Sequence, residues 1–202
     1  MTKIKFCGLT RLCEIETANE LKAEYIGFVF AQKSRRYVVP EKAKELKRAL
    51  HPYSSAVGVF VNEKVHTVAD FLNTGIIDIA QLHGSEGEEY IRQLRTLTDK
   101  PVIKAYCIRS AADTAAAEQS SADGILLDSG AGTGKLFDWK LIQNIQRPYF
   151  LAGGLEINNV AAAVRQLHPY AVDVSSGIET DGRKDKQKMA AFAAAVRKEE
   201  KR

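Results

Sequence analysis

Short, continuous runs of apolar residues alternate along this chain with longer stretches in which apolar residues recur at helical spacing. The short runs are the expected strands, at residues 4–6, 25–30, 56–61, 79–82, 102–105, 124–127, 149–152 and 171–174. Most of them are apolar throughout, as parallel strands are when both of their faces are covered. The pattern therefore predicts an α/β fold.

The stretches between these runs each have one apolar face. Three such faces consist of Val65, Val68, Ala69 and Leu72; of Val160, Ala163, Val164 and Leu167; and of Met189, Phe192, Ala193 and Val196. Pro40 suits the first turn of a helix that runs to about Leu50, and Thr10 and Asn158 are the expected N-caps of two other helices. The alanine-rich stretch 110–121 is the weakest of the expected helices.

About eight strand-and-helix units in 202 residues favour a (β/α)8 barrel, the TIM barrel. An open doubly wound sheet would have fewer strands and a glycine-rich nucleotide fingerprint after the first one. Cys7-Gly8-Leu9-Thr10 lacks the further glycines that this fingerprint requires. Because no segment resembles a linker and 45% of the residues are hydrophobic, we expect residues 1–202 to form a single barrel domain.

Composition and charge exclude several classes of partner. The formal net charge is +4, and the 29 basic and 25 acidic residues are interspersed, so there is no basic stripe of the kind that binds nucleic acid. The three cysteines lack metal-ligand spacing and predict reduced thiols and no metal site. No signal-like segment occurs, and no apolar run approaches the roughly 20 residues needed to cross a bilayer. We expect a cytoplasmic protein without a membrane partner.

Polar residues and glycines follow the expected strands, where the loops of a barrel build its active site. They are Cys7, Arg36, His83, Asp128, Gly153, Gly154, Ser175, Ser176 and Gly177. The last five follow the seventh and eighth strands, whose loops commonly bind phosphate in barrels, and glycine lets backbone amides approach an anion closely. A single glycine pair could instead make only a tight turn, but two such loops in adjacent units favour a phosphate site.

A further glycine-rich run, at residues 130–135, differs from a nucleotide-binding P-loop. Three residues rather than four separate its first glycine from the Gly-Lys pair, and Leu136 follows the lysine where Ser or Thr is required. We interpret this run as a mobile loop that covers the site. A plain surface loop is nearly as well supported.

Cys7 and Asp128 carry the sharpest chemical hypothesis. A thiol whose pKa falls below its usual value of about 8.5 at a helix N-terminus accepts a proton from carbon near neutral pH. Asp128 follows a buried strand, and partial desolvation there would keep it protonated to act as an acid. The alternative for Cys7 is a small core residue, and the alternative for Asp128 is a turn or capping residue. Together with an anion pocket, an acid and a base on different strands predict proton transfer on a phosphorylated sugar, which is isomerase chemistry.

Ten segments, in order along the chain, carry a resemblance to a known family. They are residues 5–10 (KFCGLT), 27–30 (GFVF), 33–37 (KSRRY), 57–62 (VGVFVN), 81–84 (QLHG), 126–128 (LLD), 132–135 (GTGK), 137–139 (FDW), 151–155 (LAGGL) and 172–179 (VDVSSGIE). Over essentially its full length the chain resembles the phosphoribosylanthranilate isomerases of tryptophan biosynthesis. The resemblance implies an Amadori rearrangement of N-(5-phosphoribosyl)anthranilate into 1-(2-carboxyphenylamino)-1-deoxyribulose 5-phosphate, without metal or organic cofactor.

The resemblance also implies a role for most of the candidate residues. Asp128 would protonate the furanose ring oxygen, Cys7 would remove the C2 proton, and Arg36 would pair with the anthranilate carboxylate. The five residues of the glycine and serine loops would hold the phosphate. His83 would be a neutral hydrogen-bonding group near the site, and Asp173 belongs to the motif without a role that we can derive.

Three departures from the family pattern affect loops rather than the proposed acid and base. Ala31-Gln32 replaces an aromatic-proline pair, Glu156-Ile157 replaces asparagine-proline, and Ala131 stands where glycine is common. They call loop rigidity and affinity into question more than activity.

Two other functions stay open at this point. Another phosphosugar barrel enzyme, such as a Schiff-base aldolase, would need a lysine at a strand tip, and Lys104 is the only candidate. A noncatalytic phosphosugar-binding barrel would not need both Cys7 and Asp128. We expect a monomer and leave a homodimer open, because the helices show no unusually apolar outer face.

Overall fold

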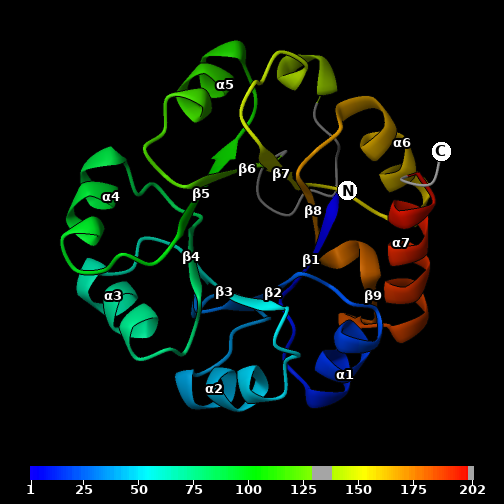
Figure 1. Cartoon of the computed structure of the whole chain (residues 1–202), viewed down its shortest axis with the longest axis horizontal. Helices are drawn as coiled ribbons and strands as arrows, with labels where there is room; N and C mark the ends of the chain where they lie inside the picture. The colour runs from blue at the N-terminus through cyan, green and yellow to red at the C-terminus, as the bar shows by residue number, and fades with distance from the viewer. Residues whose placement is uncertain (129–137, 200–202) are drawn as a thin grey trace.

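The computed structural model describes residues 1–128 and 138–199, in which eight parallel strands form a closed barrel in chain order (Figure 1). The strands are β1 (Lys3–Cys7), β2 (Tyr25–Val29), β3 (Ser55–Phe60), β4 (Ile79–Leu82), β5 (Val102–Cys107), β6 (Gly124–Asp128), β7 (Tyr149–Leu151) and β8 (Ala171–Val174). β8 pairs with β1 and closes the ring. The predicted barrel is confirmed. The glycine-rich run 130–135 lies outside the described residues.

Helices surround the ring of strands, as Figure 1 shows. They are α1 (Leu12–Glu20), α2 (Pro40–Arg48), α3 (Val65–Asn73), α4 (Glu88–Arg95), α5 (Ala111–Glu118), α6 (Ile157–Leu167) and α7 (Lys186–Glu199). Two short 3-10 helices, η1 (Trp139–Ile142) and η2 (Ser176–Ile178), follow β6 and β8. Across residues 1–128 and 138–199, no helix has the length and apolar character needed to cross a membrane.

Both predicted N-caps are wrong by one or two residues. α1 begins after Arg11 rather than after Thr10. The Glu14 carboxylate accepts hydrogen bonds from the backbone amides of Thr10 at 2.6 Å and of Arg11 at 3.0 Å. α6 begins after Glu156, which puts Asn158 inside the first turn. In each case a side chain at the third helical position satisfies the free amides, so the helix starts without the expected cap.

The core has two layers, because each strand buries both faces. Apolar side chains between strands and helices form the larger layer, and a smaller one fills the barrel. The smaller layer contains Ile103, Ala105, Leu126, Phe150, Ala152 and Ala171. β1 departs from this pattern: Ile4 and Phe6 pack in the outer layer, so Lys5 and Cys7 lie on the opposite, inner face. Charged and nucleophilic groups therefore enter the barrel along β1.

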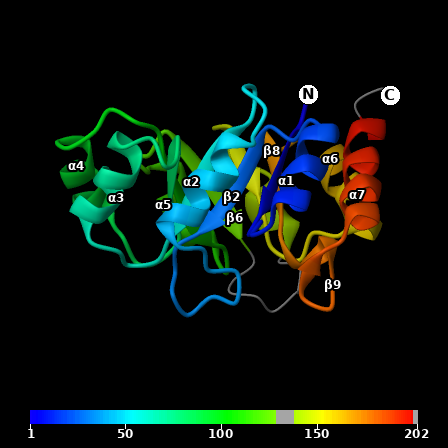
Figure 2. The same cartoon turned by 90° about the horizontal axis from the view of Figure 1, so that it is seen from below.

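A two-stranded hairpin interrupts the connection from β8 to α7. It consists of β9 (Glu179–Thr180) and β10 (Arg183–Lys184), joined by Asp181 and Gly182, which both have positive φ. Figure 2 shows β9 and the N-terminus at opposite ends of the molecule. The hairpin therefore extends the end of the barrel at which the strands terminate. The apolar pattern of the sequence did not predict it.

Candidate active site

A cavity of about 750 Å³ opens at the carboxyl ends of the strands. Of the residues predicted from the sequence to form the site, all but Gly177 line it. These are Cys7, Arg36, His83, Asp128, Gly153, Gly154, Ser175 and Ser176. The fold thus brings to one cavity side chains that are far apart in the chain: Cys7 and Ser175, for example, are 168 positions apart.

Cys7 is the last residue of β1 and sits beside a buried cation. Enclosure raises the pKa of its thiol above the ordinary value, and the neighbouring Lys5 ammonium opposes that rise. The expectation of a thiol with lowered pKa at a helix N-terminus is wrong, because α1 begins only at Leu12 and desolvation dominates. The thiol is therefore a group that Lys5 helps to ionise rather than a ready-made thiolate.

Lys5 is completely buried, and its ammonium donates to Asp173 Oδ2 at 2.8 Å. Burial alone would lower the pKa of Lys5, but Asp173 and Cys7 beside it raise it on balance. The side chain therefore stays protonated, and it presents a fixed positive charge to the thiol. Lys5 stands in the KFCGLT segment, but the sequence predicted no role for it.

Asp128 ends β6 on another part of the rim, next to His83. His83 Nε2 lies 3.5 Å from Asp128 Oδ2, and the side chains are 33% and 18% exposed. Gln81 Nε2 lies 2.8 Å from His83 Nδ1. Because the amide nitrogen can only donate, Nδ1 accepts, and the neutral ring carries its proton on Nε2, toward Asp128. The role of His83 as a hydrogen-bonding group near the site stays a prediction.

Arg36 reaches the cavity from the loop after β2 and is clamped by Glu179 of β9. Glu179 accepts from Arg36 Nε at 2.6 Å and from Nη2 at 2.9 Å. Burial alone would raise the pKa of Glu179, but the hydrogen bonds from Arg36 and Lys184 lower it below its usual range. The carboxylate therefore stays ionised and fixes the guanidinium. Glu179 is the last residue of the VDVSSGIE segment, but nothing in the sequence indicated that it lies in the site. Lys184 had no sequence signal at all.

The loops after β7 and β8 carry the residues that the sequence predicts to bind phosphate. Gly153 and Gly154 have φ angles of 83° and 64°, which only glycine adopts readily, and they turn the chain back along the cavity. Gly177 lies behind them: a Cβ there would be 2.1 Å from the Leu155 carbonyl oxygen. It thus permits the two loops to approach each other. Whether its amide also contacts phosphate stays a prediction.

Two buried acceptor atoms belong to side chains that line this cavity. Within the part of the chain that the structure describes, Gln81 Oε1 and Asp173 Oδ1 have no hydrogen-bond partner. A buried acceptor without a partner costs about 1 to 3 kcal/mol, so such atoms are expected where a ligand supplies the donor. Gln81 was missed as a site residue, although it stands in the QLHG segment.

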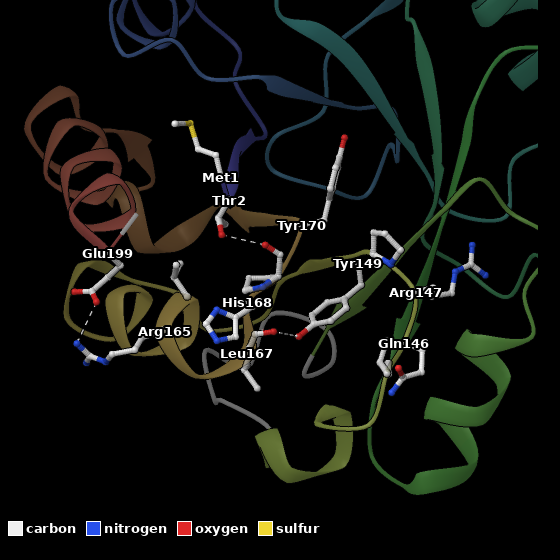
Figure 3. A pocket seen from close by; sticks show the side chains of 14 residues that line it. Met1, Thr2, Gln146, Arg147, Tyr149, Arg165, Leu167, His168, Tyr170 and Glu199 are labelled. Carbon is white, nitrogen blue, oxygen red and sulfur yellow. Dashed lines mark hydrogen bonds and ion pairs between the residues drawn. The ribbon is translucent and has the colours of Figure 1, made fainter. Parts of the chain in front are cut away.

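A second cavity, of about 910 Å³, lies at the opposite end of the barrel (Figure 3). Two of its hydroxyl groups are already engaged: Tyr149 OH donates to the Leu167 carbonyl at 2.8 Å, and Thr2 Oγ1 donates to the Pro169 carbonyl at 3.0 Å. Arg165 pairs with Glu199 at 3.2 Å. None of the residues predicted to form the active site lines this cavity. The larger cavity therefore does not contain the predicted acid and base.

Comparisons with known proteins all point to one family. The family model for N-(5'phosphoribosyl)anthranilate (PRA) isomerase matches residues 4–195. The N-(5'-phosphoribosyl)anthranilate isomerase of Thermoanaerobacter sp. strain X514 is 42% identical over 204 residues, covering 98% of each chain. The crystal structure of phosphoribosyl anthranilate isomerase from Thermotoga maritima has a TM-score of 0.90 at 36% identity, covering 98% of this chain and 100% of that one.

A further solved structure contains a ligand. It is a phosphoribosyl anthranilate isomerase in complex with reduced 1-(o-carboxyphenylamino)-1-deoxyribulose 5-phosphate, with a TM-score of 0.88 and 36% identity. It covers 98% of this chain and 100% of that one.

Proposed function

The chain belongs to the N-(5'-phosphoribosyl)anthranilate isomerase family, and on that premise we propose how its site converts N-(5-phosphoribosyl)anthranilate into 1-(2-carboxyphenylamino)-1-deoxyribulose 5-phosphate in tryptophan biosynthesis. The observation that supports this proposal is a single cavity lined by Cys7, Arg36, Asp128 and the loops after β7 and β8. A thiol, a carboxyl group, a guanidinium and two anion-binding loops match the parts of this substrate: a sugar ring, an anthranilate carboxylate and a phosphate.

Asp128 begins the reaction as the general acid. Its proton goes to the furanose ring oxygen, the C1–O bond breaks, and the nitrogen lone pair forms the C1=N bond of a ring-opened Schiff base. His83 Nε2, 3.5 Å from Asp128 Oδ2, donates toward the carboxylate that this step creates. The ring proton therefore stabilises the charge that develops on the acid.

Cys7 continues as the general base. The thiolate removes the C2 proton, and the electron pair of the C–H bond forms the C1=C2 bond of an enolamine. The enolamine then gains a proton at C1 and loses one from the C2 hydroxyl, which gives the ketose. The Lys5 ammonium favours the thiolate form against the burial that disfavours it. Proton exchange with solvent returns Asp128 to the acid and Cys7 to the thiolate.

The remaining groups bind rather than transfer protons. Arg36 pairs with the anthranilate carboxylate, because a planar guanidinium matches a planar anion. Gly153, Gly154, Ser175, Ser176 and Gly177 hold the phosphate. Gln81 Oε1 and Asp173 Oδ1, which lack partners among the described residues, accept hydrogen bonds from sugar hydroxyl groups.

The direct test is a fluorescence assay with purified protein and freshly made phosphoribosylanthranilate. Loss of substrate fluorescence on adding protein, with the product identified by mass spectrometry and chromatography, is the expected result. Heat-denatured protein serves as the control for spontaneous decay. Loss of substrate no faster than in that control overturns the proposal.

A specific contact disfavours the aldolase alternative. The Lys104 ammonium donates to the Gly84 carbonyl at 2.8 Å, and Lys104 is not among the residues that line the cavity. A Schiff-base lysine must reach the substrate carbonyl, so Lys104 does not suit that role. A noncatalytic binding barrel is separated from the isomerase by the same turnover assay.

For assembly and location we retain the expectations of a monomer in the cytoplasm. The free thiols of Cys7, Cys13 and Cys107 are compatible with a reducing compartment. Size-exclusion chromatography with light scattering measures the mass, for which 22.3 kDa is the monomer value. Twice that mass would establish the homodimer instead.

A further inference from the structure

The β9–β10 hairpin carries two buried charged side chains that have no part in the proton transfers. Glu179 and Lys184 have side chains only 5% and 2% exposed, and their charged groups lie 2.7 Å apart. Burying such a pair away from water is costly unless it has further partners. Both residues have further partners in the active site: Glu179 contacts Arg36, and Lys184 contacts Ser175 in the loop after β8.

The first connection leads from Glu179 to Arg36. Its two carboxylate oxygens accept from Nε and Nη2, which occupy one edge of the guanidinium. The neighbouring edge, formed by Nη1 and the second hydrogen of Nη2, makes no hydrogen bond to any residue that the structure describes. A guanidinium held along one edge presents the other to a second carboxylate in a fixed plane. Glu179 thus orients the fork that is to receive the substrate.

The stem of Arg36 is fixed as well. It crosses directly over Gly8, where an added Cβ would lie 2.4 Å from Arg36 Cδ. Gly8 has a φ of 78°, a backbone conformation that residues other than glycine rarely adopt. The side chain therefore passes over the backbone next to Cys7 and ends on Glu179.

The second connection leads from Lys184 to Cys7. The ammonium donates to Glu179 Oε1 at 2.7 Å, to the Ser175 carbonyl at 2.9 Å and to Ser175 Oγ at 3.1 Å. Ser175 Oγ in turn donates to the Cys7 carbonyl at 3.0 Å. One ammonium thus joins the carboxylate that orients Arg36 to the loop that follows β8 and to the residue that carries the thiol.

We propose that Glu179 and Lys184 are positioning residues for the substrate carboxylate: they hold the Arg36 guanidinium at a fixed distance and angle from Cys7 and the phosphate loop. The inference rests on the proposed function in that it takes the Arg36 ligand to be the anthranilate carboxylate. Neither residue touches the substrate. Their effect is exerted through Arg36, and it falls on binding of the aromatic carboxylate rather than on proton transfer.

The test is a double-mutant cycle on Glu179 and Arg36. E179Q keeps the shape of the side chain but turns an amide N–H toward Nη2, so that one acceptor is lost. We expect E179Q alone to raise KM about tenfold and to change kcat less than threefold. In the R36M background the same substitution should change KM less than twofold, because the residue through which it acts is gone.

A second arm repeats the cycle without turnover. Anthranilate serves as the probe, and its own fluorescence reports equilibrium binding to the wild type, E179Q, R36M and the double variant. We expect the dissociation constant of anthranilate to change in the same pattern as KM across these four proteins. This arm separates the two proposals: no turnover by the wild type overturns the proposed function, while the binding cycle still decides the role of Glu179.

R92M is the control. Arg92 pairs with Glu89 on the surface of α4 and its side chain is 71% exposed, so we expect KM and anthranilate binding to change less than twofold. K184M should raise KM in the same direction as E179Q, and thermal unfolding of each variant shows whether it is folded at the assay temperature. Wild-type KM and anthranilate affinity in E179Q, or an equal effect of E179Q with and without Arg36, overturns the inference.

Discussion

At the carboxyl ends of its strands the barrel encloses a cavity of about 750 Å³, and at the amino ends it encloses one of about 910 Å³. The first is lined by a thiol, by carboxyl groups and by buried acceptors that lack partners among the described residues. In the second, the phenol of Tyr149 and the hydroxyl of Thr2 are bonded to backbone carbonyls of the same region. The difference teaches that unsatisfied polarity, not volume, distinguishes a reaction site from a space between elements.

The same difference appears in the way charge is used at the two ends. Arg147, at the amino end, donates to the carbonyls of Ser120 at 2.8 Å and Ala122 at 2.7 Å and so ties loops together. Arg36, at the carboxyl end, is held by Glu179 along one edge only. The Arg147 guanidinium donates to carbonyls of the fold itself, whereas Arg36 Nη1 makes no hydrogen bond to any residue that the structure describes. Substitutions at the carboxyl end should therefore lower activity, and substitutions at the amino end should lower stability instead.

The largest expected effect is at the acid and the base. Asp128→Asn and Cys7→Ala should each lower kcat by about a thousandfold or more, because each removes one of the two proton-transfer groups. Binding of the reduced product analogue, measured by isothermal titration calorimetry, should stay within about threefold of wild type. Cys13→Ala, which removes an exposed thiol, is the control and should leave kcat unchanged. Full turnover in either of the first two variants contradicts the acid-base assignment.

The next effect is at the carboxylate subsite. Arg36→Met should raise KM about a hundredfold and lower kcat much less, because the lost charge-assisted hydrogen bonds bind the substrate rather than the transferred proton. Steady-state kinetics over a wide substrate range separates the two parameters. Arg92→Met is the control, since that side chain is 71% exposed on α4 and should leave both parameters unchanged. An unchanged KM would remove Arg36 from the subsite.

A smaller effect concerns the titration of Cys7. Because burial raises the pKa of the Cys7 thiol above its usual value, its thiolate fraction grows as the pH rises toward that pKa. Alkylation by iodoacetamide should therefore accelerate from pH 7 to pH 9 in a Cys13→Ala, Cys107→Ala background, with a higher midpoint than for an exposed cysteine. A rate that is already constant at pH 7 would mean that Lys5 outweighs the burial.

The smallest effect is expected at the other end of the barrel. Tyr149→Phe removes the hydrogen bond to the Leu167 carbonyl and should lower the free energy of unfolding by about 1 kcal/mol, measured by urea denaturation. Its kcat/KM should equal that of wild type. A loss of turnover comparable to that of Arg36→Met would break the contrast between the two ends.

The sequence predicted the strands because each has to be apolar on both faces. All eight were predicted from continuous apolar runs, and their ends agree with the structure within two residues. The hairpin of β9 and β10 escaped prediction, since each of its strands has two residues, and all four are charged or polar. The N-caps at Thr10 and Asn158 were wrong because Glu14 and Asn159, farther along the helix, satisfy the free amides instead.

The candidate site was predicted as a set of residues but not as a network. Cys7, His83 and Asp128 could be predicted because each follows an apolar run directly, and a parallel barrel brings the ends of such runs to one rim. The partners of Cys7 and Arg36 could not be predicted in this way. Glu179 lies 143 positions from Arg36, and nothing in the local pattern relates the two residues.

By itself, therefore, the order of apolar runs determined the number of strands, their direction and the end of the barrel at which the reactive groups meet, because these follow from the burial of local segments. Only the tertiary structure decided that Lys5 stands beside the thiol, that Glu179 holds Arg36 and that two acceptors lack partners among the described residues. Desolvation and ion pairing depend on distances across the barrel, and those distances exist only once the ring of strands has closed.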